Sequence, residues 1–376
     1  MPYTEKKVKA TINESKADIS GIRASAYRIP TDCPESDGTL EWSATTLVVV
    51  EASAAKQTGI GCTYADSATA SLINDLLADL VIGRDAMSIP ANWLEMVRAI
   101  RNLGRPGISS MASAAVDNAL WDLKARLLGL PLVKLLGAVH DRVPLYGSGG
   151  FTSYDENRLC RQLAGWVEHG IPRVKMKVGR DPRRDPVRVA AARKAIGPHA
   201  ELFVDANGAY LRKQALQMAE RFRESQVSWF EEPVSSDDLA GLRLLRDRAP
   251  AGMEVAAGEY GYDLPYFERM LAAGAVDVLQ ADVTRCAGIS GFLEVAALCE
   301  ARSLPLSAHC GPSMHVHPCC AVRPLRHIEY FHDHVRIEQM LFDGALAPRD
   351  GFLVPDLSRP GVGLEFRRSD AEKYKI

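Results

Sequence analysis

The spacing of hydrophobic and polar residues along this chain changes its period near residue 143. Before that point, β-branched and apolar runs at residues 19–29 and 45–51 predict two strands. Gly59 and Gly61 predict a turn that leads into a partner strand at residues 62–64. Apolar residues then recur at helical spacing in three stretches, residues 67–80, 90–103 and 110–128. These elements together predict an α+β domain.

Beyond residue 143, short apolar strands alternate with helical stretches such as residues 158–169 and 213–223. The strands begin roughly 22 to 30 residues apart, which is typical of a barrel built from βα units. They are expected at residues 143–146, 173–178, 202–205, 227–230, 254–257, 276–280, 304–308 and 326–329. Eight regular units favour a closed (β/α)₈ barrel over a doubly wound open sheet, and no glycine-rich dinucleotide fingerprint follows any strand.

The alternation ends near residue 341, where prolines and glycines punctuate the chain. A barrel takes about 250 residues, so a chain of 376 residues has room for one smaller domain. We expect an N-terminal α+β capping domain at residues 1–138, a barrel catalytic domain at residues 139–340, and a C-terminal segment at residues 341–376 that packs on the capping domain.

Composition narrows the class of protein. Hydrophobic residues make up 47% and charged residues 24%, as in globular enzymes. The formal net charge of -2 argues against a nucleic-acid or membrane-surface role, because both favour an excess of Lys and Arg. Residues 1–7 show no secretory signal, and no run is long enough to span a bilayer. The eight cysteines form no C-x-x-C pair, so we expect reduced thiols and a cytoplasmic location.

Three neighbouring strands of the expected barrel end in a carboxylate. These are Asp205, then Glu231 or Glu232, and then Glu259. Residues at the C-terminal ends of barrel strands point into the active site, where carboxylates this close repel one another unless a cation lies between them. All-oxygen ligands favour a hard ion, so the sequence predicts Mg²⁺ completed by water and substrate.

A candidate base and a candidate acid accompany these carboxylates. Lys175 and Lys177 share one face of the second strand, and both are expected to point into the barrel mouth. His309 ends the seventh strand and Asp282 ends the sixth, which predicts a dyad. Removal of a proton beside a carboxylate makes an enediolate with two negative charges, which a divalent ion stabilises. A lysine beside another cation has a lowered pKa and suits the role of base.

These positions resemble the enolase superfamily and, within it, the mandelate racemase subgroup. They occur in the order of that family and span nearly the whole chain. The matching segments are residues 114–126 (AAVDNALWDLKAR), Lys175-x-Lys177, Val204-Asp205-Ala206-Asn207, Glu231-Glu232-Pro233, Gly258-Glu259, Asp282, His309 and Glu329.

The resemblance implies a role for each position. Asp205, Glu231 and Glu259 would bind Mg²⁺, which selects Glu231 over Glu232. Lys177 would be the base on one face of the substrate, and His309, oriented by Asp282, would be the acid or base on the opposite face. Lys175 would lie near the substrate carboxylate, and Glu329 would form a hydrogen bond to a carboxylate oxygen as the enediolate forms. Asn207 would contact the substrate. The resemblance also implies a homo-oligomer with an even number of subunits, commonly an octamer or a dimer.

The lysine and the histidine permit two reactions, dehydration of a sugar acid or racemisation of a 2-hydroxy acid. Residues 31–42 lie between two predicted strands without regular periodicity, and the resemblance suggests that they close over the site as a specificity lid. Their acidic and hydroxyl-bearing content suits a polyhydroxylated carboxylate substrate. We therefore expect an acid-sugar dehydratase that acts on an aldonate or aldarate, with a racemase or epimerase as the alternative.

Two further readings come from other classes. His315, His317, Cys319 and Cys320 suggest zinc, and with it a zinc-dependent barrel hydrolase, but their spacing matches no usual zinc motif. A binding-only relative would have lost part of the constellation, and every position is present. Residues 332–334 (HDH) are expected to form a solvated loop.

Overall fold

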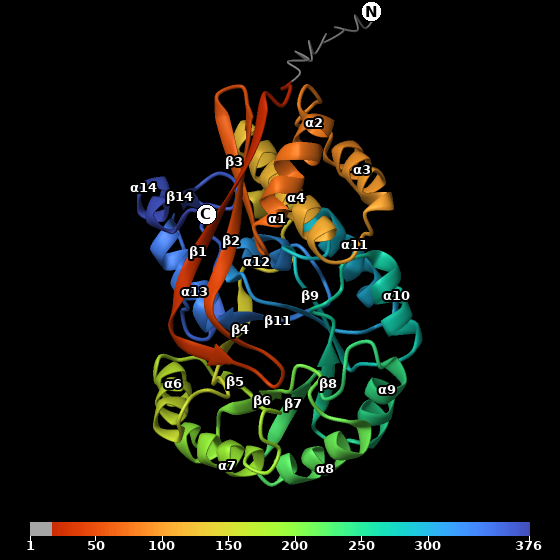
Figure 1. The fold of residues 1–376 in the computed structure, drawn as a ribbon, viewed down its shortest axis with the longest axis vertical. Coiled ribbons are helices and arrows are strands. Elements are labelled where there is room, and N and C mark those ends of the chain that lie inside the picture. The colour runs from red at the N-terminus through yellow and green to blue at the C-terminus, as the bar shows by residue number, and fades with distance from the viewer. Residues whose placement is uncertain (1–16) are drawn as a thin grey trace, which may run out of the picture.

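The computed structural model describes residues 17–376 of the chain. It contains a barrel with helices around it and a smaller unit of strands and helices that lies against one end (Figure 1). The expectation about a secretory signal concerns residues 1–7, which lie outside the described residues.

The smaller unit is an antiparallel sheet covered by helices. Its strands are ordered β1-β2-β3, and its buried apolar side chains form a cluster of their own between the sheet and the helices. The strands are β1 (Gly21–Ser36), β2 (Glu41–Ala54) and β3 (Gln57–Tyr64), and the helices are α1 (Ala68–Leu72), α2 (Ala78–Val81), α3 (Ile89–Ala99) and α4 (Ile108–Leu127), with a π-helical turn (Ile73–Leu77) between α1 and α2 and a 3-10 turn (Ile100–Asn102) after α3.

The predicted turn at Gly59 and Gly61 is wrong, because both residues lie inside β3. The turn is formed by Ala55 and Lys56, both with positive φ. The glycines instead allow close approach to α4, since a Cβ on Gly61 would lie 2.1 Å from the carbonyl oxygen of Ala115. Close packing of a strand on a helix, not a turn, explains these glycines.

Eight parallel strands form the closed barrel. They pair in chain order from β4 to β11, and β11 also pairs with β4, with Ile328 opposite Leu145. This closure confirms the barrel prediction and shows that the open-sheet alternative is wrong. The strands are β4 (Val143–Gly149), β5 (Arg173–Lys177), β6 (Glu201–Asp205), β7 (Val227–Glu231), β8 (Glu254–Ala257), β9 (Val278–Ala281), β10 (Leu306–Ala308) and β11 (Leu325–Phe331).

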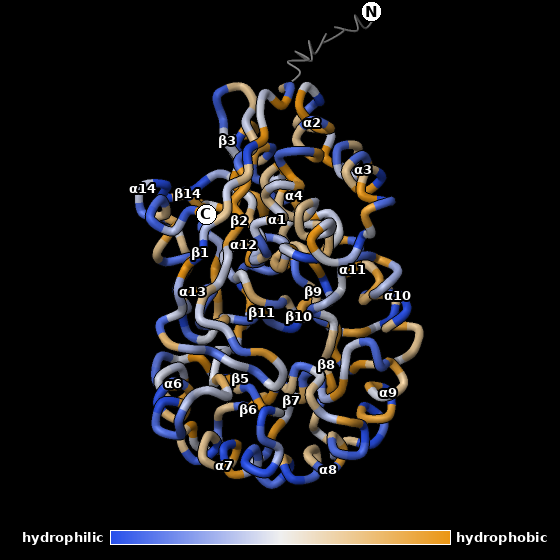
Figure 2. Tube along the Cα trace, in the orientation of Figure 1, coloured by the Kyte–Doolittle hydropathy of each residue, from blue (hydrophilic) through white to orange (hydrophobic). Residues whose placement is uncertain are grey.

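Helices surround this barrel on the outside (Figure 1). Hydrophilic stretches mark the outer helices such as α8, whereas β2 of the smaller unit has a hydrophobic stretch along its middle (Figure 2). Inside the barrel, Tyr146, Phe203 and Trp229 form an apolar cluster with Ala256 and Val278. The helices are α6 (Glu156–Glu168), α7 (Asp185–Ile196), α8 (Arg212–Arg223), α9 (Leu239–Arg248), α10 (Leu264–Ala272), α11 (Gly288–Ala301), α12 (Pro312–Cys320) and α13 (His332–Leu341), and α5 (Leu132–Leu136) precedes β4.

The C-terminal segment contacts both parts of the fold. In it, β13 (Phe352–Leu353) pairs antiparallel with β4, and β12 (Phe342–Asp343) pairs with β14 (Glu365–Phe366). It continues through α14 (Arg368–Ala371) and a 3-10 turn (Glu372–Tyr374). At the end of the chain, the Ile376 amide donates a hydrogen bond to the Ala26 carbonyl of β1. The domain boundaries at residues 138 and 340 stay a prediction.

Helix α4 joins the smaller unit to the barrel through buried polar side chains. The Asp122 carboxylate accepts hydrogen bonds of 2.7 Å from the amides of Ile60 in β3 and Val362 in the C-terminal segment. The Asn118 side chain donates to the Val283 carbonyl and accepts from the Ile289 amide. These bonds satisfy buried groups that would otherwise destabilise the fold, and they fix the loop that follows β9.

Residues 31–42 are not an irregular segment between strands. They belong to a continuous hairpin in which β1 runs to Ser36 and β2 begins at Glu41, and the hairpin reaches across to the barrel (Figure 1). Its tip lies against the ends of β5 and β6, where a Cβ on Gly38 would come within 2.8 Å of the Val178 and Ala206 carbonyl oxygens. The pairing register of the two strands shifts between Pro30 and Glu35, which accounts for the lack of regular periodicity in this segment.

Within residues 17–376, no helix is both long and apolar enough to cross a membrane.

Candidate active site

Three buried carboxylates meet at the C-terminal ends of neighbouring barrel strands. Asp205 ends β6, Glu231 ends β7 and Glu259 follows β8, and they offer ligand oxygens that all lie within 4.8 Å of one another. Each is at most 4% exposed. Burial and the neighbouring Asp205 raise the pKa of Glu231 well above its ordinary value, which reflects the cost of crowding negative charges.

Two lysines from β5 offset part of this charge. Lys175 Nζ lies 2.5 Å from Glu231 Oε1 and 2.8 Å from Glu329 Oε1, and Lys177 Nζ lies 2.5 Å from Asp205 Oδ2. Burial is the largest influence and opposes the charged ammonium of Lys177, but the carboxylates of Asp205, Glu259 and Glu231 together outweigh it and raise the pKa of Lys177 above its ordinary value. The adjacent cation of Lys175 acts in the predicted direction, but its influence is weaker than that of the Asp205 carboxylate.

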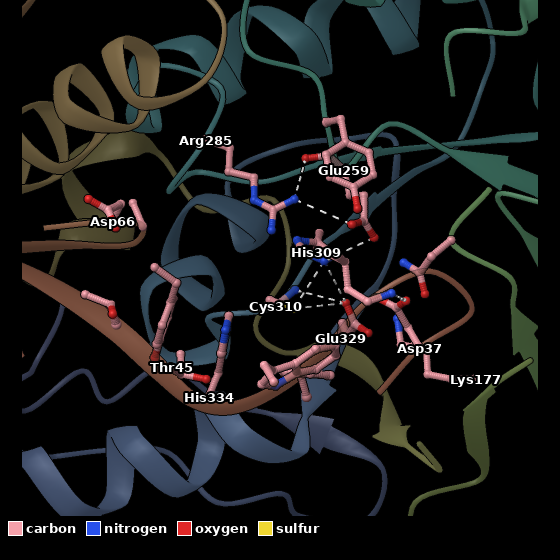
Figure 3. A pocket seen from close by; sticks show the side chains of 18 of the residues that line it. Asp37, Thr45, Asp66, Lys177, Glu259, Arg285, His309, Cys310, Glu329 and His334 are labelled. Atoms are coloured by element: carbon pink, nitrogen blue, oxygen red, sulfur yellow. Dashed lines mark hydrogen bonds and ion pairs between the residues drawn. The ribbon is translucent and has the colours of Figure 1, made fainter. Parts of the chain in front are cut away.

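His309 follows β10 and lies at the centre of the site (Figure 3). Its Nδ1 atom is 2.8 Å from Asp282 Oδ2, and its Nε2 atom is 3.3 Å from Glu259 Oε2. Burial raises the pKa of Asp282, but the bond to His309 and further positive neighbours outweigh this and hold it below its ordinary value. The structure thus brings the predicted dyad together.

The last two predicted site residues also lie here. Glu329, in β11, accepts a hydrogen bond of 3.2 Å from the Cys310 amide in addition to its contact with Lys175. Asn207 has a φ of 45°, and its amide donates to Asp205 Oδ1 at 2.9 Å. Within the described part of the chain, Asn207 Oδ1 and Glu259 Oε2 are buried and accept no hydrogen bond, although Glu259 Oε2 has the 3.3 Å contact with His309 Nε2.

These side chains line a cavity of about 410 Å³ between the barrel mouth and the β1–β2 hairpin. Lys177, Asn207, Glu259, His309 and Glu329 come from the barrel. The smaller unit contributes polar and aromatic residues: Asp37, Trp42, Thr45, Thr46, Tyr64 and Asp66. The lid expectation for residues 31–42 agrees with this placement, since Asp37, Leu40 and Trp42 line the cavity.

Several lining residues had no signal that pointed to the site. His334 belongs to α13, not to the solvated loop expected at residues 332–334, and its ring stacks on that of Tyr64 at a centroid distance of 3.4 Å. The loop prediction failed because no sequence feature shows that α13 packs against β3. Arg285 and Cys310 follow the predicted Asp282 and His309 closely in sequence, and this proximity to strand ends is a signal that could have identified them.

The cluster at residues 315–320 does not form a zinc site. All of it lies in the buried helix α12. His315 Nε2 accepts a hydrogen bond from the Val283 amide, and His317 Nδ1 accepts one from the Val133 amide. Burial lowers the pKa of His317 to about 4, so its ring is neutral. His315 thus holds the loop that follows β9, and His317 contacts helix α5.

Comparison with known families decides the identity. Residues 158–371 match the model of the enolase C-terminal domain-like family, and residues 34–137 match that of the mandelate racemase / muconate lactonizing enzyme N-terminal domain. The chain belongs to the mandelate racemase subgroup of the enolase superfamily. Its fold and the order of its strand-end residues are those expected from the resemblance.

Relatives of this family cover nearly the whole chain. A mandelate racemase/muconate lactonizing enzyme-like protein from Rubrobacter xylanophilus is 57% identical, covers 96% of this chain and 100% of its own, and superposes with a TM-score of 0.94. The 3,6-anhydro-alpha-L-galactonate cycloisomerase of Streptomyces coelicolor is 32% identical over 93% of this chain and 98% of its own length.

A third relative is the L-talarate/galactarate dehydratase of Salmonella typhimurium, 33% identical over 73% of this chain and 68% of its own length. Its structure with Mg and L-lyxarohydroxamate superposes over 100% of this chain and 96% of that one, at 27% identity and a TM-score of 0.88. The donor set found here fits the same ion, because three buried carboxylates supply the hard oxygen ligands that Mg²⁺ prefers. Mg²⁺ is thus the cofactor that the site and this relative both indicate.

Proposed function

We propose that this chain is an Mg²⁺-dependent acid-sugar dehydratase that acts on an aldonate or aldarate. One observation carries the proposal. Lys177 and His309 line the same cavity, but they come from β5 and β10, which are separated by two strands on one side of the barrel and four on the other. A substrate between them would meet an ammonium or amine on one face and an imidazole on the other.

The dehydration can be written with these residues in named roles. The substrate carboxylate lies near Glu329 and Lys175, and neutral Lys177 takes the proton from the α-carbon. His309, protonated, gives a proton to the β-hydroxyl, the C–O bond breaks, and water leaves. The resulting enol becomes a 2-keto-3-deoxy acid. General acid–base steps of this kind contribute about 10²- to 10⁴-fold each.

Asp205, Glu231 and Glu259 would hold the metal. A bound Mg²⁺ supplies stabilisation of the charge that develops on the substrate carboxylate and compensates the Asp205 carboxylate, which is the main reason for the raised pKa of Lys177. The residues themselves position and desolvate the substrate, since the cavity is closed on one side by the β1–β2 hairpin.

The side of the cavity that the smaller unit lines, here called the cap side, suits a polyhydroxylated substrate. Thr46 and Tyr64 carry hydroxyl groups among the residues that line this side, and Asp37 and Asp66 carry carboxylates. The Tyr64 hydroxyl is buried and has no hydrogen-bond partner among residues 17–376. Such groups recognise sugar hydroxyls, which both donate and accept hydrogen bonds. Relatives named for anhydrogalactonate and for talarate and galactarate point to the same substrate class.

The test is a screen of aldonates and aldarates with purified protein and Mg²⁺ in D₂O, with a 2-keto-acid assay and proton NMR. A keto-acid product that disappears in Lys177→Met and His309→Asn supports the proposal. Exposed Lys213→Met is the matched control, because Lys213 lies on the outer helix α8. The proposal fails if the full library gives no keto acid while the protein binds Mg²⁺ and is folded.

A racemase or epimerase is the second candidate, because the same two-sided arrangement allows one residue to remove the α-proton and the other to return one. Deuterium incorporation with inversion and no loss of water would favour it. Assembly as a homo-oligomer and a cytoplasmic location also stay predictions of this proposal.

A further inference from the structure

A second group of metal-ligand atoms lies beside the carboxylate triad. His309 Nε2, Cys310 Sγ and a Glu329 oxygen lie within 4.8 Å of one another, and all three residues are buried. We propose that they form a separate site for Zn²⁺ and similar thiophilic ions, and that such an ion inhibits the enzyme. The inhibition rests on the proposed function, whereas the binding site does not.

The distances among the three ligand atoms suit a zinc ion. Cys310 Sγ lies 3.2 Å from His309 Nε2 and 3.4 Å from Glu329 Oε2, and His309 Nε2 lies 3.6 Å from Glu329 Oε2. Tetrahedral zinc with Zn–N and Zn–O near 2.1 Å and Zn–S near 2.3 Å separates its ligand atoms by about 3.4 to 3.6 Å. Each measured distance is within a few tenths of an ångström of this range, so an ion can be bound with little movement of the side chains.

The chemistry of the two sites separates their ions. Asp205, Glu231 and Glu259 offer only oxygen, which suits Mg²⁺, while the group around Cys310 offers nitrogen, sulfur and oxygen, which suits softer ions. The open side of the second group faces the cavity, which His309, Cys310 and Glu329 all line (Figure 3). Three protein ligands with a fourth position open to a small molecule is the arrangement of accessible zinc sites.

Binding of zinc at this position would remove the group that the reaction needs. The Nε2 atom of His309 is the one that faces the cavity, because Nδ1 is bonded to Asp282. A coordinated Nε2 has no free lone pair to carry a proton. Zinc would therefore inhibit even when the carboxylate triad is saturated with Mg²⁺, and it would compete with substrate for the same cavity.

The binding test uses Co²⁺ as the probe on the full chain in saturating Mg²⁺. Cobalt bound through Cys310 gives a sulfur-to-cobalt charge-transfer band in the near ultraviolet, whereas cobalt in the all-oxygen triad does not. We expect the band in the wild type and its loss in Cys310→Ala. Cys160→Ala is the matched control and should keep the band, because Cys160 lies on the outer helix α6 and not in the site. A Zn²⁺ titration should show affinity at least ~10-fold weaker in Cys310→Ala.

An unchanged band or zinc affinity in Cys310→Ala would overturn the proposed site. Cys310→Ser serves as the second variant where the alanine variant does not fold, since it keeps the shape of the side chain and removes the thiolate. In the activity assay, Zn²⁺ should reduce the wild-type rate. Each Cys310 variant is compared with its own rate without zinc, and the Zn²⁺ concentration that halves this rate should be at least ~10-fold higher than for the wild type. A cobalt band without any dehydratase activity would retain the zinc site and reject only the proposed function.

Discussion

The Asp282 carboxylate and the His309 imidazole are joined by a hydrogen bond of 2.8 Å between Oδ2 and Nδ1. Asp282 is itself held in place, because its Oδ1 atom accepts a hydrogen bond of 2.7 Å from the Thr284 amide. With Nδ1 donating to the carboxylate, Nε2 is directed to the cavity, where the proposed function needs it to exchange protons. The orientation of His309 is thus decided by a residue from the preceding strand end.

Replacement of Asp282 by Asn should therefore reduce turnover without removal of His309. The amide can present its NH₂ group to Nδ1 and favour the wrong tautomer. We expect kcat to fall by about 10²- to 10⁴-fold, measured with the best substrate from the screen. Asp247→Asn, on the outer surface of α9, is the control of equal charge change. Wild-type turnover in Asp282→Asn would show that the dyad has no role.

Mg²⁺ should stabilise the folded chain through the carboxylate triad. An ion at 100 times its Kd adds about 2.7 kcal/mol to the free energy of unfolding, which a thermal melt detects. Glu259→Gln should lose most of this stabilisation because a ligand oxygen is lost from the triad. Glu232→Gln is the matched control, since Glu232 is equally buried but lies outside the triad. If Glu232→Gln and not Glu259→Gln abolishes the effect, the ligand assignment is wrong.

An aldonate should be a better substrate than the aldarate of the same hydroxyl configuration. The far carboxylate of an aldarate would approach Asp37 and Asp66 on the cap side. Two like charges about 4 Å apart repel by about 1 kcal/mol even in bulk water, which corresponds to about fivefold in kcat/KM.

Asp66→Asn should reduce the ratio of kcat/KM for the aldonate to kcat/KM for the aldarate, because it removes one of the two negative charges. The asparagine still has an oxygen that can accept the hydrogen bond from the Ala68 amide, as Asp66 Oδ1 does. Kinetics on paired aldonates and aldarates give the measurement. A wild-type preference for the aldarate, unchanged in Asp66→Asn, would contradict this reading of the cap.

The β1–β2 hairpin should lose stability as the pH rises. Burial raises the pKa of Glu35 to about 8, nearby Asp333 and Asp32 add to the rise, and the Trp42 hydrogen bond and Arg336 oppose it. Because the folded carboxyl keeps its proton above the ordinary pKa of 4.5, the folded state binds more protons between pH 4.5 and about 8. Stability is then highest below this window and falls as the pH increases through it.

Glu35→Gln should remove this dependence. Thermal melts and hydrogen exchange of residues 31–42 at pH 6 and pH 9, buffers chosen for the comparison, should show a smaller difference for the variant than for the wild type. Equal pH dependence in the two proteins would mean that Glu35 is ionised in the folded state across this range.

Gly61→Ala should weaken the contact between β3 and α4. The added Cβ would lie 2.1 Å from the Ala115 carbonyl oxygen and 2.5 Å from the Ala119 amide nitrogen, both of which are backbone atoms that cannot rotate away. We expect a loss of about 1 to 3 kcal/mol in the free energy of unfolding, measured by chemical denaturation. Gly165→Ala on α6 is the control, because its Cβ would meet nothing within 4 Å; a loss of similar size there would argue against this explanation.

The barrel and most of the candidate site positions could be predicted because their signals are local. A short apolar run that ends in a carboxylate, as at Asp205 or Glu231, predicts both a strand and the residue at which the strand ends. Parallel strands all present these ends on one side, so the chemistry can be read from chain order alone. The family resemblance then chose Glu231 over Glu232, and the structure brings Glu231 into the triad.

The cap side of the cavity could not be predicted in the same way. Tyr64 and His334 are 270 positions apart in the sequence and stack only because β3 and α13 converge over the barrel mouth. The same is true of Glu35, whose pKa depends on Asp333 from α13. Such contacts depend on how two folded units pack against each other. The periodicity within either segment does not predict which other segment it will contact.

The sequence by itself determined where the candidate site residues lie, because spacing and strand position place Lys177, Asp205, Glu259 and His309 at one end of one barrel. Only the tertiary structure decided the surroundings of those residues. Asp282 directs which nitrogen of His309 faces the cavity, and Asp205 is the neighbour that most raises the pKa of Lys177. The physical reason is that pKa and ligand recognition depend on through-space distances of a few ångströms, which arise only when distant segments pack together.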